Sequence, residues 1–299
     1  MRVAIIIPYF GKWPQWFNFY LYSCSKNPMV DFLFYTDCDI PKKIYDNTIF
    51  TKISYGDYCE WVSQKMNINF HPNHAYKLCD LRPFFSIVHE SDIKDYDFWG
   101  FADIDLFYGD LSMIVNEKSL TENNLITCHA DRISGHFTII RKSSELSRIG
   151  KKIKNWKFKL ESQDHYGLDE VDLTQLVYPQ LKNVLRFYRY VIEPMFGLGC
   201  HDFLNRVNYW YGKLTKKSFI EYYTTPIPSG NDQWLYDLEK SIIISPLKKR
   251  LPYLHFLFFK KTPYLKTDRY WTEGFWQIPM DMEYKGNIYI TINGISNNK

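Results

Sequence analysis

Ten residues, FWGFADIDLF at positions 98–107, decide how this chain is interpreted. An apolar, aromatic run leads to Asp103 and Asp105, and the chain then turns apolar again. If the run is a buried strand, its side chains alternate between two faces, so both carboxylates leave the same face. Burying two acids costs free energy unless their charge is neutralised. A divalent cation can neutralise them, and in such sites the cation usually also binds phosphate oxygens. The run therefore predicts a metal site; the competing interpretation is a strand end whose acids are solvated or cap the next turn.

The first 37 residues predict a parallel α/β unit. A β-branched run at 3–7 ends at Pro8, a helical segment runs through 16–21, and a second apolar run at 31–37 ends on an acid. Continuous apolar runs of this length are typical of strands that are buried on both faces. Strand, helix and strand with short connections indicate parallel pairing.

The ends of these two strands are expected to bind a ligand, because ligands of such sheets lie outside the carboxyl ends of the strands. Pro8, Tyr9 and Phe10 follow the first strand, and Asp37 ends the second. All four should therefore lie on one rim. Asp37 is equally well explained as a turn residue.

The rest of the chain continues the α/β pattern. We expect strands at 49–53, 125–128 and 134–141, helices at 58–66, 143–158 and 168–177, a hairpin at 234–244, and two short strand-like runs near the end. The predicted fold class is α/β: one Rossmann-like domain with a central mixed, mostly parallel sheet and an aromatic-rich C-terminal extension.

Two pairs of charged residues are candidates on helices. Lys77 and Asp80 are three residues apart and so share a helix face, which by itself describes an ordinary surface ion pair. Asp169 and Glu170 open a predicted helix after Gly167, a place where acids also simply complement the helix dipole.

His255 lies in an apolar strand just before Lys260 and Lys261. A lone histidine in such a strand is more often a satisfied core residue than a ligand. The six cysteines are scattered without a C-x-x-C pair, which predicts reduced thiols.

Composition excludes some classes of function. A net charge of +4 is too small to argue for nucleic acid, and no nucleic-acid motif is present. The aromatic share of 18% suits stacking on sugars or nucleotides, but it equally suits a thick core. No signal peptide or membrane span is evident, so a cytoplasmic protein is expected, with association at the inner membrane surface left open.

In sequence order, these pieces resemble nucleotide-sugar-dependent glycosyltransferases of the A-type fold. The resemblance is closest to bacterial polysaccharide and lipopolysaccharide sugar transferases related to families 8 and 32, and it runs from Met1 to about Pro263. It rests on the order of AIIIPYFG at 4–11, YKLCD at 76–80, DID at 103–105, SGHF at 134–137, LDEVD at 168–172, and the late HF…KK-P at 255–263.

The resemblance implies a role for each motif. Residues 1–180 would form the nucleotide-sugar-binding core, and 181–299 the acceptor side of the same catalytic domain. Asp103, Asp105 and His255 would hold Mn²⁺ or Mg²⁺. The donor, expected to be a UDP-sugar, would meet Pro8, Tyr9, Phe10, Asp37, Lys77, Asp80, Asp103, Ser134, Gly135 and His136, with Lys260 or Lys261 at the diphosphate. Asp169 and Glu170 would lie nearest the reacting carbon.

The implied activity is transfer of a hexose from a nucleotide diphosphate sugar to a glycan or lipid-linked glycan acceptor. Capsule, O-antigen or lipopolysaccharide synthesis is the expected setting, with retention of configuration. Glu170 stands where family 8 has Gln, which leaves inversion open, and the spacing from His255 leaves the choice of lysine open. The alternatives are a carbohydrate-binding or assembly protein on an inactive fold, or another metal-dependent nucleotidyl or phosphoryl enzyme.

Overall fold

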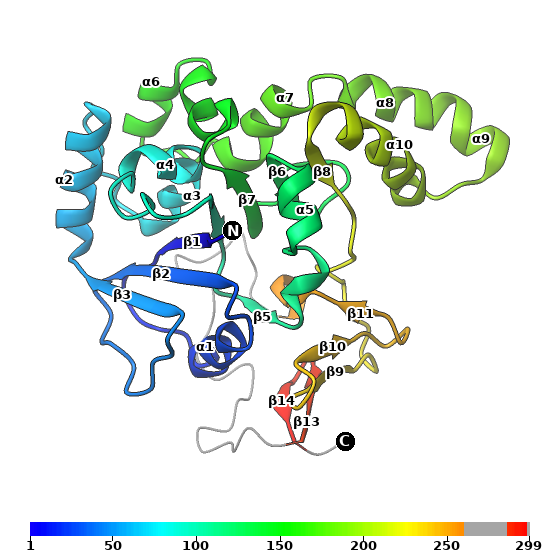
Figure 1. Cartoon of the computed structure of the whole chain (residues 1–299), viewed down its shortest axis with the longest axis horizontal. Coiled ribbons are helices and arrows are strands. Elements are labelled where there is room, and N and C mark those ends of the chain that lie inside the picture. The colour runs from blue at the N-terminus through cyan, green and yellow to red at the C-terminus, as the bar shows by residue number, and fades with distance from the viewer. Residues whose placement is uncertain (260–285, 298–299) are drawn as a thin grey trace.

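The computed structural model of this chain describes residues 1–259 and 286–297. Its centre is a seven-stranded sheet (Figure 1). The strand order is β3 (Thr48–Lys52), β2 (Val30–Thr36), β1 (Val3–Pro8), β4 (Phe98–Ala102), β7 (Phe137–Arg141), β6 (Leu125–Thr127) and β8 (Lys217–Phe219). β7 is antiparallel to both its neighbours, and the other pairs are parallel. The predicted α/β class with a mixed, mostly parallel central sheet is confirmed.

Both faces of this sheet are buried, which is why its strands are apolar throughout. In β1, Val3, Ile5 and Ile7 belong to one core cluster, whereas Ala4 and Ile6 belong to a second. This split follows the alternation of side chains along a strand. Burial on both faces is typical of parallel sheets covered by helices.

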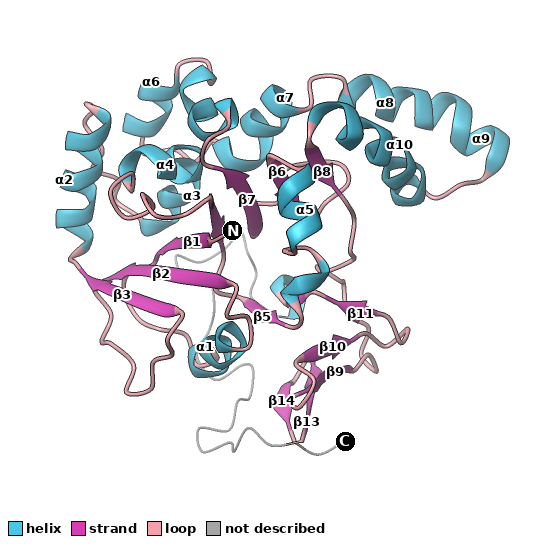
Figure 2. Cartoon of the chain, in the orientation of Figure 1, coloured by secondary structure: helices cyan, strands magenta, loops and turns pink. Residues whose placement is uncertain are grey.

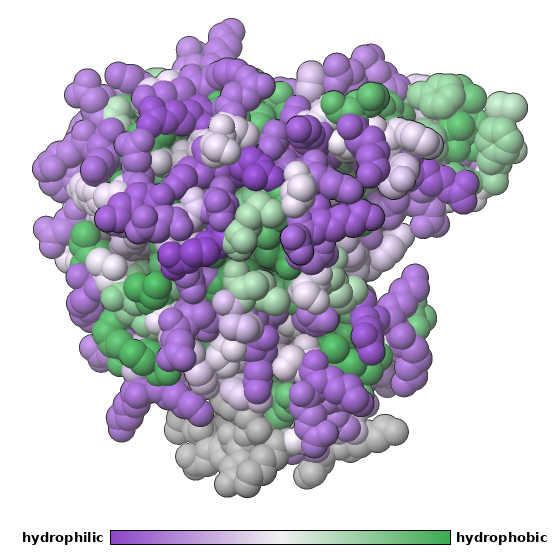
Figure 3. Space-filling view, viewed as in Figure 1, coloured by the Kyte–Doolittle hydropathy of each residue, from purple (hydrophilic) through white to green (hydrophobic). Residues whose placement is uncertain are grey.

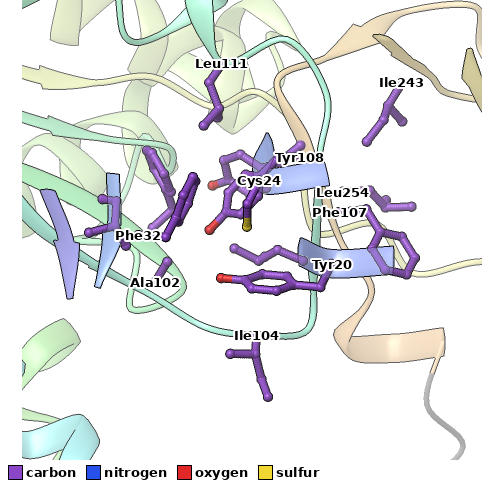
Figure 4. Packing of buried hydrophobic residues seen from close by; sticks show 14 of the residues in the cluster. Tyr20, Cys24, Phe32, Ala102, Ile104, Phe107, Tyr108, Leu111, Ile243 and Leu254 are labelled. Carbon is purple, nitrogen blue, oxygen red and sulfur yellow. The ribbon is translucent and has the colours of Figure 1, made fainter. Parts of the chain in front are cut away.

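Helices cover each face. The buried side of α1 (Phe17–Ser25) packs into the first cluster, and Tyr20 and Cys24 from it are shown among their neighbours in Figure 4. The second cluster takes in α2 (Tyr55–Met66), with most of the helices along the top in Figure 2. The remaining helices up to residue 177 are η1 (Ala75–Lys77), α3 (Leu78–Leu81), η2 (Arg82–Phe84), α4 (Phe85–Val88), η3 (Leu111–Met113), α5 (Glu117–Glu122), η4 (Glu145–Lys152), α6 (Trp156–Glu161), η5 (Leu168–Asp172) and α7 (Leu173–Val177).

The prediction of one strand through both acids of the Asp-x-Asp run is wrong. β4 ends at Ala102 and β5 (Leu106–Tyr108) begins after a bend, so both acids lie on the bend. The chain bends because β5 leaves the central sheet and pairs with β12 (Tyr253–His255). The indole Nε1 of buried Trp16 donates to the Ile104 carbonyl at 2.9 Å and holds the bend.

The C-terminal part adds an antiparallel sheet of five strands in the order β11-β10-β9-β13-β14. Their bounds are β9 (Trp234–Asp237), β10 (Ile242–Ile244), β11 (Arg250–Leu251), β13 (Asn287–Thr291) and β14 (Gly294–Ser296). The predicted hairpin at 234–244 and the two late strands are confirmed. The Tyr236 hydroxyl donates to the Tyr108 carbonyl at 2.7 Å and ties this sheet to β5.

Between α7 and β8 along the chain, an αα-hairpin projects from the molecule, at the upper right in Figure 1. It consists of α8 (Leu181–Phe187), η6 (Tyr188–Ile192) and α9 (Glu193–Phe196), a turn at Gly197 with φ of +61°, and α10 (Cys200–Thr215). A short 3₁₀ turn, η7 (Leu257–Phe259), follows β12. Among the described helices, none combines the length and apolar character that a membrane crossing requires. All six cysteines are free thiols, as predicted.

Gly100 tests the packing of the central sheet. A Cβ at this position would lie 2.3 Å from the Thr138 carbonyl oxygen and 2.9 Å from the Ile5 side chain. We expect Gly100→Ala to lower the free energy of unfolding by about 1–3 kcal/mol or more, the usual cost of overpacking a core. Urea denaturation measures it.

Gly56→Ala is the matched control, since a Cβ there meets nothing closer than Ser54 Oγ at 4.0 Å. In α2 this change should leave stability unchanged or raise it by up to about 1 kcal/mol. Equal effects of both substitutions would contradict the close approach of strands at Gly100.

Candidate functional site

The structure brings together the three residues that the sequence predicts as metal ligands. Asp103 and Asp105 lie on the bend after β4, and β12 pairs with β5 so that His255 is opposite Leu106. One ligand atom from each of the three lies within 4.8 Å of the others. His255 Nε2 is 3.5 Å from Asp105 Oδ1.

The imidazole of His255 is held in place and left with one nitrogen unsatisfied. Its Nδ1 lies 3.0 Å from Thr225 Oγ1, and its backbone N–H donates to the Thr224 carbonyl at 2.8 Å. Its ring stacks on His136 with centroids 4.1 Å apart. Nε2 is buried and has no hydrogen-bond partner within the described residues. An unpaired polar atom in a buried position is costly, so a nitrogen facing two carboxylates fits a cation ligand.

Arg82 is the functional residue that the sequence analysis missed. Its guanidinium donates from Nη2 to Asp103 Oδ1. From Nη1 it donates to Asp169 Oδ2, at a distance of 2.8 Å. The same Nη1 donates to the Gly135 carbonyl at 2.9 Å. Asp103, Asp105 and His255 are here called the metal-type cluster, and Asp169 with Glu170 the acidic pair. Arg82 thus joins the metal-type cluster to the acidic pair on η5. The available signal was a lone basic residue in the apolar helical stretch LCDLRPFF at 78–85.

The acidic pair faces Gly135. Glu170 Oε1 accepts a hydrogen bond from the Gly135 N–H at 3.0 Å. A Cβ on Gly135 would lie 2.9 Å from Glu170 Oε1, 3.0 Å from Asp169 Oδ2 and 3.1 Å from Arg82 Nη1. Only glycine therefore lets this loop approach both acids.

Burial raises the pKa of Asp169 to about 7, although Arg82 opposes the shift, and neighbouring Glu170 adds to it. Burial likewise raises the pKa of Asp103, again against Arg82. A carboxyl group that exchanges its proton near neutral pH is suited to general acid–base chemistry.

Lys77 and Asp80 are buried, so their interpretation as a surface ion pair is wrong. Lys77 Nζ lies 2.9 Å from Asp80 Oδ2 and also donates to the carbonyls of Lys159 and Asp164. The Asp80 carboxylate accepts from the backbone N–H groups of Tyr166 and Leu168, each at 2.9 Å. The pair thereby fixes the loop that leads into η5.

The predicted rim at the ends of β1 and β2 is formed. Asp37 Oδ1 accepts from the Gly11 N–H at 2.7 Å, and the Tyr9 N–H donates to the Tyr35 carbonyl at 2.9 Å. Burial raises the pKa of Tyr9, and the charge of Asp105 adds to the shift, so this rim borders the metal-type cluster. Pro8 ends β1, and Phe10 packs against the ring of Tyr58.

Ser134 and His136 are buried beside the same cluster. The Tyr253 hydroxyl lies 2.9 Å from His136 Nε2, and Ser134 Oγ also contacts this ring. Burial lowers the pKa of His136 far below its ordinary value, and the nearby His255 lowers it further, so the ring is neutral. Lys260 and Lys261 lie outside the described residues.

A family comparison covers most of this site. Residues 5–191 match the family described as "Family of unknown function (DUF6625)". The chain belongs to this family. The matched region contains Arg82, Asp103, Asp105 and Asp169, whereas His255 lies beyond it.

Comparison with individual proteins adds little. No curated protein matches the chain. Among solved structures, the galactosyltransferase LgtC in complex with donor and acceptor sugar analogues is similar over 57% of this chain and 71% of that chain, with 14% sequence identity and a TM-score of 0.29.

The pKa of Asp169 predicts how stability depends on pH. An aspartate in the unfolded chain loses its proton near pH 3.9, whereas folded Asp169 keeps it up to about pH 7. Between these two pH values the folded state binds one proton more than the unfolded state. The free energy of unfolding therefore falls as pH rises through this range, by up to ~1.4 kcal/mol per pH unit.

In Asp169→Asn this proton is absent, so the stability of the variant relative to wild type should increase as pH rises from about 5 to about 7. Urea denaturation at several pH values measures the difference, and any constant cost of the asparagine cancels from the slope. Parallel pH dependences of the two proteins would contradict the assignment.

Proposed function

We propose that this protein is a metal-dependent glycosyltransferase that moves a hexose from a nucleotide diphosphate sugar to a glycan or lipid-linked glycan acceptor. The observation that carries the proposal is the position of Arg82 between Asp103 and Asp169. Through Arg82, the candidate cation site and Asp169, whose pKa is raised, belong to one cluster of side chains. In transfer from a nucleotide sugar, the cation would neutralise the departing diphosphate, and the carboxyl group would stabilise the oxocarbenium-like transition state or accept the proton of the acceptor.

Asp103, Asp105 and His255 would hold Mn²⁺ or Mg²⁺. Carboxylate oxygens with one imidazole suit these ions better than a structural zinc. The bound cation would supply charge neutralisation for the departing diphosphate and would orient it.

The chain's own residues would position the reaction around that site. The rim of Pro8, Tyr9, Phe10 and Asp37 would bind the nucleoside. Gly135 would let the sugar approach the acids, and Asp169 would hold or accept a proton beside the reacting carbon. Retention is the proposed outcome, and inversion with Glu170 or Asp169 as the base is the runner-up.

The remaining predicted donor residues would act indirectly. Lys77 and Asp80 use their hydrogen bonds on the loop before η5, so we propose that they position Asp169. Ser134 and His136 would position the imidazole of His255 through the ring stack. Lys260 or Lys261 stays the proposed contact of the diphosphate.

Hydrolysis of a panel of nucleotide sugars tests the function. The purified chain should slowly release nucleoside diphosphate from one donor when Mn²⁺ is present, and it should stop when a chelator is added. Cleavage between the two phosphates would instead indicate a nucleotidyl or phosphoryl enzyme. Binding of glycans without any metal-dependent turnover would indicate a carbohydrate-binding protein.

Metal binding is tested separately from turnover. His255→Gln removes the imidazole and should weaken Mn²⁺ binding at least tenfold in calorimetric titration, since even indirect partners of a metal site change affinity by 10–100-fold. His165→Gln is the matched control. It belongs to a second acidic group, with Asp80 and Asp169, in which the Asp80 oxygens already accept backbone hydrogen bonds.

The control should bind Mn²⁺ as the wild type does. A larger loss in His165→Gln than in His255→Gln would move the metal to the second group and remove His255 from the site. Melting curves in chelator show whether either variant is merely misfolded.

The acidic pair is tested with isosteric amides. If Asp169 or Glu170 takes part in proton transfer or charge stabilisation, Asp169→Asn or Glu170→Gln should lower kcat about 10²-fold, with donor binding largely kept. Asp172→Asn, from the same helix, is the control for a role in the helix dipole. Wild-type turnover in both amide variants would exclude the pair from catalysis.

A further inference from the structure

The αα-hairpin at residues 181–216, here called the arm, carries an unusual share of the chain's charge. It contains six Lys and Arg residues against two Asp and Glu residues. Its net charge of +4 equals that of the whole chain, so the remaining residues sum to zero. The basic residues are Lys182, Arg186, Arg189, Arg206, Lys213 and Lys216.

The arm also exposes large apolar side chains. Tyr190 is 75% exposed, Phe196 and Trp210 are each 69% exposed, and Leu214 is 86% exposed. Phe187, Met195 and Tyr209 are also more than half exposed. Figure 3 shows an apolar patch at the right-hand end of the molecule, over the arm, with hydrophilic side chains around it. Such a patch with a polar border marks an interaction surface.

The charges and the apolar groups share the exposed faces of the arm. Along α10, Arg206, Tyr209, Trp210 and Lys213 are exposed at helical spacing, whereas Leu204 and Asn208 on the opposite side are buried. Lys213 Nζ lies 5.8 Å from the centroid of the Tyr209 ring. On the first helix, Arg186 and Arg189 alternate with exposed aromatic neighbours.

We propose that the arm docks on a membrane surface that contains anionic phospholipids. Basic and aromatic residues on one helical surface are typical of helices that lie in the bilayer interface, where the apolar groups enter the boundary and the cations meet lipid headgroups.

Charge complementarity selects this occupant. A second copy of the chain would bring an arm of the same +4 charge, so arm-to-arm pairing would place like charges together. A neutral glycan would suit the aromatic rings but would leave the concentration of cations unexplained. An anionic bilayer matches both the charge and the apolar groups.

The segment 221–225 connects the arm to the candidate site, with one hydrogen bond at each end. Asn205 of α10 accepts at Oδ1 from the Glu221 N–H at 2.9 Å. Four residues on, Thr225 Oγ1 lies 3.0 Å from His255 Nδ1. Docking would therefore hold the site near the lipid surface. The inference that the acceptor is lipid-linked rests on the proposed function, whereas membrane docking does not.

Vesicle co-sedimentation of the full chain tests the proposal, without metal or nucleotide sugar. The protein should bind vesicles of phosphatidylcholine with phosphatidylglycerol, bind phosphatidylcholine alone far less, and be released by high salt. The triple variant Lys182→Gln, Arg186→Gln and Arg189→Gln should lower the partition coefficient at least tenfold, given the contribution of each basic residue near an anionic surface.

The matched control removes the same charge elsewhere, with Lys151→Gln, Lys152→Gln and Lys154→Gln, all at exposed positions. It should bind as the wild type does. A second variant, Met195→Ser with Phe196→Ser, keeps every charge and should also bind at least tenfold less.

Three results would overturn the proposal. One is no binding to the anionic vesicles, and another is an equal loss in the arm variant and the charge control. The third is a wild-type protein that does not bind vesicles but is a dimer in size-exclusion chromatography, with the dimer dissociated by Met195→Ser with Phe196→Ser. That result would assign the arm to contact with a second copy of the chain. Because no donor is present in these experiments, failure of the transferase proposal leaves their outcome unaffected.

Discussion

The pairing of the largely buried Arg82 guanidinium with Asp103 and Asp169 is the interaction on which the candidate site depends. Asp103, Asp105 and Asp169 can place three negative charges close together, and Arg82 supplies one positive charge between two of them. Burial raises the pKa values of Asp103 and Asp169, and the neighbouring carboxylates add to both shifts against Arg82. Removing one partner of such a buried pair leaves an uncompensated charge, which is strongly destabilising. A divalent cation would restore neutrality on the side that Arg82 does not reach.

Around this charge cluster, further side chains fix the orientation of the ligand side chains. His136 stays neutral because it is buried, so it can stack on His255 without adding charge. His129 packs edge-on against His136 and lies 3.1 Å from Glu221 Oε2. Preorganisation by such indirect contacts is what gives a ligand set a defined geometry.

Much of the fold could be predicted from the sequence, because buried parallel strands read as continuous apolar runs. β1 and β2 follow this rule, and Asp103 with Asp105 interrupt an apolar run plainly enough to be noticed. The antiparallel hairpin at β9 and β10 was also predicted. The bend between the two acids could not be predicted, since it follows from the pairing of β5 with β12, far along the chain. The burial of Lys77 and the bridging role of Arg82 were missed for the same reason: each depends on partners more than 20 residues away.

The pairing of β5 with β12 has a consequence for how the molecule is assembled. β5, which directly follows Asp105, and β12, which carries His255, are separated by almost half of the chain, so a long loop must close before they meet. Contacts of such sequence separation form late and slow the folding of the proteins that contain them. During synthesis, the central sheet up to β7 can form while His255 is still absent. A cation in this site would thus bind only to finished molecules, and its binding energy would stabilise the joining of the two ends of the fold.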